Sequence, residues 1–238
     1  MTDRAARSAG PILRPSVFDG LPRIAAGFTT RAFAPADEGR EATRQRLREA
    51  TGFREVASVG QVHRADVAAV TAGGHTPEHD GLVTDRAGVL LTTVAADCAL
   101  VLLADGDAGA VGACHSGWRG TVAGVLARTV AAMEALGADA RGLRAYVGPC
   151  ISAERFEVGE EVAAQFAPEV VVRRAAWPRP HVDLKAELAR QLRALGVEAR
   201  HTEIADGCTV GETDRYYSYR AEGGTPGRML GFIGRQEG

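Results

Sequence analysis

The chain has 238 residues, a formal net charge of −2 at pH 7, and a composition that is 45% hydrophobic and 24% charged. This balance is typical of a globular protein with a substantial core, and the length fits one large domain or two small ones. Aromatic residues make up 5% of the chain and no basic stripe is interleaved with them, so the sequence favours no nucleic-acid partner.

No segment of the sequence has the pattern of an export signal or a membrane span. Residues 1–20 lack a continuous apolar stretch and are predicted to be a flexible N-terminal segment. The longest apolar run, residues 89–104, is interrupted by Asp97 and is shorter than the roughly 20 residues of a membrane-spanning helix. We therefore predict a cytoplasmic protein without a membrane partner.

The first half of the chain is rich in short apolar runs. Residues 55–70 contain two β-branched runs separated by GQVHRAD, which predicts a strand, a connection and a second strand. Residues 72–81 are dense in turn-forming residues and predict a loop. Residues 88–106 predict two buried strands, or one bent strand, with a break at Asp97-Cys98. Residues 108–115 predict a further strand.

The second half of the chain mixes helical and strand patterns. Residues 121–137 and 183–196 carry apolar residues at helical spacing, with Asp183 as the predicted N-cap of the second helix. Further strands are predicted at 143–149, 197–204 and 228–235. Because helices are scattered among many strands, we predict a single α/β (α+β) domain over residues 1–238, with mixed sheets flanked by helices.

The four cysteines are too sparse for a disulfide framework and contain no CxxC pair, so reduced thiols are expected. One of them, Cys98, joins His63 and His115 in a shared pattern. Each of these three residues lies where an apolar run gives way to polar or glycine-rich sequence. Three ligands from separate elements, with a fourth position left for water, are typical of a catalytic zinc site.

The chemistry of this donor set narrows the choice of metal. A thiolate and two imidazoles favour Zn or Cu(I) over Mg or Ca. A structural interpretation stays open at this point. In it Cys98 is simply buried, His63 caps a turn, and His115 is satisfied by a backbone carbonyl. The adjacent Cys114 would point to the opposite face of the strand, into the core.

Six motifs occur in an order that resembles the laccase-domain family, also called multicopper polyphenol oxidoreductases. They are GQVHRADV, HDGLVTDRAGVLLTTVAADCALVLL, AVGACHSGWRGT, YVGPCISAERFEVGEEV, DGCT and YYSYRAEGGTPGR, and the similarity runs from about Gly27 to the C-terminus. The resemblance implies a layered α-β-β-α fold. It also implies that His63, Cys98 and His115 are the metal ligands and the catalytic residues.

Members of this family are described as purine nucleoside phosphorylases with adenosine deaminase activity, and some as peptidoglycan editing factors. The resemblance therefore implies zinc-dependent phosphorolysis of adenosine and inosine, with methylthioadenosine as a further candidate, to ribose 1-phosphate and free base. Adenosine deamination to inosine is also implied. The expected partners are purine nucleosides and phosphate, for a monomer or homodimer.

Copper is the alternative metal, but a four-copper laccase is excluded by the ligand count. The chain has six histidines and none are paired as His-x-His, whereas a trinuclear cluster and a blue site need more. Two other functions remain as alternatives. One is a metal-free hydrolase with Cys98 as nucleophile and His115 as base. The other is a peptidoglycan precursor editing factor whose nucleoside turnover is incidental.

Phosphorolysis needs cationic donors that can grip phosphate, and arginine binds phosphate through paired N–H groups. The predicted substrate-binding arginines are Arg31, Arg119 and Arg220, although each could serve packing instead; Arg119, for example, could cover Trp118. Asp97 is predicted to contribute as well, either by orienting a neighbouring ligand or by capping a local turn.

Three further polar residues are weaker candidates. Asp80 in HDG has the pattern of a turn residue, with an acid–base role as the alternative. His75 and His79 lie in the predicted loop and are expected to be solvated, with a ligand role as the alternative.

Overall fold

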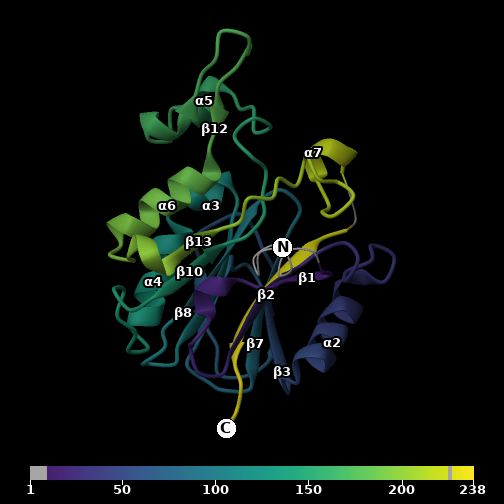
Figure 1. The fold of residues 1–238 in the computed structure, drawn as a ribbon, viewed down its shortest axis with the longest axis vertical. Helices are drawn as coiled ribbons and strands as arrows, with labels where there is room; N and C mark the ends of the chain where they lie inside the picture. The colour runs from purple at the N-terminus through teal and green to yellow at the C-terminus, as the bar shows by residue number, and fades with distance from the viewer. Residues whose placement is uncertain (1–9, 225–226) are drawn as a thin grey trace.

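A computed structural model describes residues 10–224 and 227–238 of the chain. Two sheets pack face to face between helices, so that the layers run α-β-β-α (Figure 1). Helix α2 (Gly39–Thr51) covers one sheet, while α4 (Val125–Glu134) and α6 (Leu184–Ala194) cover the other. This confirms the predicted single α/β domain with mixed sheets flanked by helices.

Within the described residues, each main sheet has six strands. The first has the order β1 (Ile12–Leu13), β2 (Ile24–Thr29), β14 (Met229–Arg235), β7 (Val89–Ala95), β3 (Glu55–Val59), β5 (Gly74–Thr76). The second has the order β13 (Thr202–Ile204), β10 (Arg144–Val147), β8 (Ala99–Ala104), β9 (Val111–Ser116), β6 (Gly81–Thr84), β4 (Val67–Ala69). Parallel and antiparallel pairs occur in both sheets.

Shorter elements complete the domain. The remaining helices are α3 (Trp118–Ala123), α5 (Glu160–Ala163) and α7 (Tyr219–Glu222), with 3₁₀ turns η1 (Ser16–Phe18), η2 (Pro168–Val170) and η3 (Ala199–His201). A two-stranded hairpin, β11 (Val171–Val172) with β12 (His181–Val182), packs with α5 around a small apolar cluster that also includes Leu184 of α6. This part projects from the top of the molecule in Figure 1.

Strands β7 and β8 are buried along their whole length because both of their faces are covered. In β8, Val101 and Leu103 pack toward the helices, while Leu100 and Leu102 pack toward the other sheet. Such strands read as continuous apolar runs rather than as alternating ones. The predicted break at Asp97-Cys98 is confirmed as the connection between the two strands.

The helix predicted at 121–137 is wrong as one continuous element. Gly124 adopts φ 83°, a left-handed conformation that glycine tolerates, and it separates α3 from α4. The helical prediction at 183–196 is confirmed, and the Asp183 carboxylate accepts a hydrogen bond from the Ala186 N–H at 2.9 Å. The loop predicted at 72–81 also contains the short strand β5, which pairs in parallel with β3.

The N-terminal part of the chain is only partly described. Of the segment predicted to be flexible, residues 1–9 lie outside the described residues, whereas β1 and η1 pack at the edge of the domain, β1 against β2. In the described part of the chain, no helix combines the length and apolar character needed to cross a bilayer.

The topology brings three strand ends to one edge of the sheet sandwich. Strands β3 and β7 run parallel and end at the same edge. Strand β8 leaves from this edge, and its first residue Ala99 pairs with Ser116, the last residue of antiparallel β9. The segments that follow β3 and β7, and the end of β9, therefore meet at this edge between the two sheets.

Candidate metal centre and its cavity

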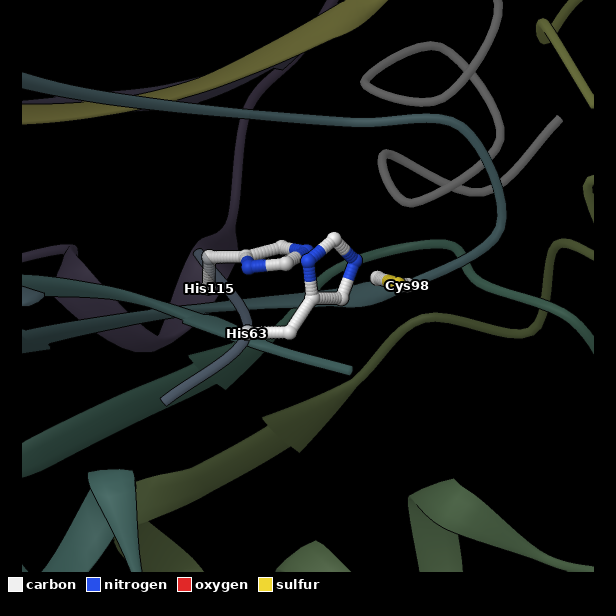
Figure 2. A group of neighbouring side chains, drawn as sticks. All are labelled: His63, Cys98 and His115. Carbon is white, nitrogen blue, oxygen red and sulfur yellow. The ribbon is translucent and has the colours of Figure 1, made fainter. Parts of the chain in front are cut away.

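His63, Cys98 and His115 converge at this edge. One ligand atom from each lies within 4.8 Å of the others, and Figure 2 shows the three side chains gathered at one place. His63 follows β3, Cys98 stands between β7 and β8, and His115 is near the end of β9. The donor set and its spacing fit one metal ion, with protein ligands of the kinds that zinc prefers.

Asp80 organises two of these three residues. Its carboxylate is fully buried and accepts a hydrogen bond from His115 Nδ1 at 2.8 Å. It also accepts the backbone N–H groups of Val62, His63 and Arg64 at 3.1, 3.1 and 2.7 Å. Because Nδ1 of His115 is held in this way, its Nε2 is left to face a metal ion.

The electrostatics of the centre favour the ligating form of the thiol. Burial opposes ionisation of Cys98, but hydrogen bonds to His115 and His63 outweigh it and lower the pKa of the thiol. Burial likewise opposes a charged His115, but Asp80 and Cys98 outweigh it and raise the pKa of that imidazole. A thiolate is the form of cysteine that binds metals and acts as a nucleophile.

Gly117 makes room for two of the three side chains. A Cβ atom built on Gly117 would lie 2.8 Å from Cys98 Sγ and 3.2 Å from Cδ2 of His63. The glycine has φ −68° and ψ 166°, a conformation open to any residue. Its side-chain size, not its backbone, is therefore what the site requires.

Replacing Gly117 with alanine should weaken metal binding without unfolding the protein. The added methyl group displaces Cys98 Sγ, and we expect affinity for zinc to fall about 10- to 100-fold, as for other residues that support ligands. Competition with a chromophoric chelator measures the change. Gly10→Ala is the control, because a Cβ built there has no neighbour nearer than 3.6 Å and the backbone is not left-handed. Unchanged affinity in Gly117→Ala would contradict the crowding argument.

Asp97 supports the turn that carries Cys98. It adopts φ 89°, and its carboxylate accepts hydrogen bonds from Thr209 Oγ1 at 2.6 Å and from the backbone N–H of Arg220 at 2.7 Å. Its backbone carbonyl accepts the Ile151 N–H at 2.9 Å. The carboxylate that accepts a hydrogen bond from a ligand imidazole is instead that of Asp80, which the sequence favoured as a turn residue.

The centre opens into a cavity of about 830 Å³. Three residues of its wall, His63, Glu78 and Asp97, adopt positive φ although none is glycine. Strained backbone of this kind concentrates at functional sites, because the surrounding structure must hold it in place. The cavity is therefore the candidate substrate site.

The structure brings one of the three predicted arginines to the cavity. Arg220 lines it, and its guanidinium donates to the backbone carbonyls of Arg155 and Glu157. Arg31 instead pairs with the Glu222 carboxylate at 2.5 Å and stacks on Tyr217.

Arg119 lies over Trp118, its guanidinium carbon 4.3 Å from the ring centroid, and only the tryptophan is among the cavity-lining residues. Three other arginines, Arg40, Arg44 and Arg228, line the cavity. The sequence did not predict these three as substrate-binding residues, because no motif joins residues 40 and 44 to residue 228.

The two remaining histidine candidates lie outside the convergent group. His75 lines the cavity, but its Nδ1 is 3.1 Å from Ser58 Oγ. His79 Nδ1 is 2.6 Å from the Pro77 carbonyl oxygen. In the part of the chain that the structure describes, no other cluster of three such side chains accompanies His63, Cys98 and His115.

The fold and the site define a class: an α/β protein whose cavity wall carries a His-Cys-His group able to bind a metal ion. Residues 36–236 match the model of the family described as multi-copper polyphenol oxidoreductase laccase, and the chain belongs to this family. The resemblance inferred from the motifs is confirmed.

Similar proteins of named activity or known structure support the family assignment. The chain is 43% identical over 203 residues to a purine nucleoside phosphorylase of Deinococcus radiodurans, covering 82% of this chain and 78% of that protein. It is 35% identical over 163 residues to adenosine deaminase RL5 of an unknown prokaryotic organism, covering 66% and 62% of the two chains. The crystal structure of YlmD from Geobacillus stearothermophilus matches with a TM-score of 0.86 at 31% identity, over 96% of this chain and 97% of that one. The chain is thus an enzyme of this family.

Proposed function

We propose that the protein is a zinc-dependent purine nucleoside phosphorylase that also deaminates adenosine. The observation that carries this proposal is the placement of the His63, Cys98 and His115 ligand atoms, within 4.8 Å of one another, in the wall of a cavity lined by both aromatic and arginine side chains. Two relatives, a purine nucleoside phosphorylase and an adenosine deaminase, support the same two activities.

The residues present fit a single zinc ion. The thiol is disposed to ionise, one imidazole is oriented by a buried carboxylate, and three protein ligands leave a coordination position for water or substrate. A zinc ion bound there supplies a Lewis acid and activates water near neutral pH. The proposed role of this chain's own residues is to hold that centre at the cavity wall and to position the nucleoside against it.

The cavity offers aromatic surface for a purine. Trp118, Phe156 and Tyr219 line it, and Tyr219 is 61% exposed although it is a large side chain. Purine bases stack on aromatic rings without needing a specific hydrogen-bond pattern. Stacking of this kind suits an enzyme that accepts both adenosine and inosine.

Replacing Tyr219 with alanine should raise KM for adenosine and inosine about 10-fold, with kcat changed less. Loss of base stacking is worth about 1–3 kcal/mol, and 1.4 kcal/mol corresponds to a factor of ten. Steady-state kinetics with both nucleosides measure the effect. Tyr219→Phe, which keeps the ring, should behave as the wild type. Equal losses in the two variants would contradict stacking.

Product analysis tests the proposed function directly. Zinc-loaded enzyme is incubated with adenosine or inosine, with and without phosphate, and the products are separated by liquid chromatography. We expect ribose 1-phosphate and free base only when phosphate is present, and inosine from adenosine in either condition. Recovery of both nucleosides unchanged from the zinc-loaded enzyme would refute the proposal.

One observation favours a second candidate, a metal-free cysteine hydrolase. The lowered pKa of Cys98 beside His115 also describes an activated nucleophile and its base. In that mechanism His63 has no required role, so the two candidates differ in what a His63 variant does.

A further inference from the structure

Three arginines gather on one wall of the cavity. Arg40 and Arg44 stand four residues apart on α2, and Arg228 precedes β14. Arg40 lies close enough to each of the other two to disfavour their positive charges. Like charges at i and i+4 destabilise a helix, so this arrangement does not serve the stability of α2.

The most enclosed member of the cluster is incompletely neutralised. The Arg44 side chain is 14% exposed, and its Nε is buried with no hydrogen-bond partner among the described residues. Its carboxylate neighbour Glu41 is 89% exposed, 3.3 Å away, and therefore provides weak compensation. Burial, only partly offset by Glu41, lowers the pKa of Arg44, and Arg40 lowers it further. A buried cation left in this state favours an anion as its partner.

Arg228 links the cluster to the candidate metal centre. Burial and the charge of Arg40 lower its pKa, while attraction to Cys98 and Asp97 opposes this effect. The Asp97 carboxylate already accepts hydrogen bonds from Thr209 and from the Arg220 N–H. Arg228 therefore places a third guanidinium group in the cavity that His63, Cys98 and His115 also line.

We propose that Arg40, Arg44 and Arg228 form a subsite for a phosphate group, placed across the cavity wall beside the His63–Cys98–His115 centre. Arginine guanidinium groups bind phosphate oxygens through paired hydrogen bonds. The inference deepens the proposed function and rests on it for the identity of the nucleoside. The bound group is either inorganic phosphate, the second substrate of phosphorolysis, or the phosphate ester of a nucleoside 5′-monophosphate.

Isothermal titration calorimetry with inorganic phosphate tests the subsite independently of turnover. The wild type should bind one phosphate per chain, and Arg44→Gln and Arg228→Gln should each weaken binding at least about 10-fold, as expected for loss of a charge-assisted contact. Arg48→Gln is the matched control, because Arg48 is on the same helix but does not line the cavity. In phosphorolysis, KM for phosphate should rise by a similar factor, while KM for the nucleoside changes less than threefold.

The outcomes separate the subsite from the function. No phosphate binding to the wild type, or equal binding by Arg44→Gln, Arg228→Gln and Arg48→Gln, would overturn the subsite even if phosphorolysis occurs. Binding lost in the two cavity variants without any phosphorolysis would support the subsite and refute the phosphorylase. A nucleoside 5′-monophosphate that competes with phosphate and is turned over in preference to the nucleoside identifies the ester as the natural source. Consumption of phosphate with the free nucleoside as co-substrate identifies inorganic phosphate as the natural ligand of the subsite.

Discussion

Replacing His63 with asparagine should abolish stoichiometric zinc binding and reduce both nucleoside activities by at least about 10³-fold, equivalent to about 4 kcal/mol in the activation free energy. His63 is the most exposed of the three predicted ligands and adopts φ 61°. Asparagine tolerates this left-handed conformation, and the backbone N–H still reaches Asp80. The variant therefore removes the imidazole and little else. Metal analysis of untagged protein and single-substrate kinetics give the two readouts.

His75→Asn is the matched control, because His75 lines the same cavity but stands outside the ligand group. It should retain zinc and activity within about threefold. A wild-type protein that turns over substrate without metal, together with an active His63→Asn and an inactive Cys98→Ala, would instead establish the cysteine hydrolase. The mechanism with Cys98 as nucleophile and His115 as base does not require His63, so the result discriminates between the zinc enzyme and the cysteine hydrolase.

Replacing Asp80 with asparagine should lower both the stability of the protein and its affinity for zinc. The carboxylate accepts four hydrogen bonds while fully buried, and an amide offers one oxygen and introduces a donor toward His115 Nδ1. We expect the free energy of unfolding to fall by about 3 kcal/mol, as when a buried charged partner is removed. Zinc affinity should fall about 10- to 100-fold, because the ring of His115 loses its orientation. Urea denaturation and chelator competition measure the two effects.

The pH dependence of this difference has a defined sign. Burial alone would raise the pKa of Asp80, but hydrogen bonds from His115 and the backbone outweigh it and lower that pKa. The ionised carboxylate therefore stabilises the fold above the unfolded pKa of about 3.9, and this contribution disappears as the pH falls through the lower folded value. Although burial opposes it, Asp80 together with Cys98 raises the pKa of His115 to about 9. The stability gap between wild type and Asp80→Asn should therefore widen as the pH falls from about 9 to the unfolded histidine value of about 6.5, and it should shrink below about 4. A gap that goes on widening below about pH 4 would contradict the assigned role.

Much of the architecture follows from local pattern. Strands β7 and β8 can be predicted from the sequence because both of their faces are buried and almost every residue is apolar. Helix α6 can be predicted because Asp183 caps it and leucines recur at helical spacing. The helix over 121–137 was mispredicted because the backbone conformation of an isolated glycine cannot be predicted from the sequence. Gly124 adopts the left-handed conformation and interrupts the helix.

The sequence by itself determined the family, the α/β class and the three residues proposed to bind metal, because these rest on residue type and on motifs read along the chain. The tertiary structure alone decided which groups surround them. Asp80, Gly117 and the cluster of Arg40, Arg44 and Arg228 act through contacts between elements that are distant in the chain. A hydrogen bond, a steric limit or a shared cavity wall depends on distances of a few ångströms in space. Periodicity along the chain does not contain these distances, because they are set only when strand register and helix packing bring distant elements together.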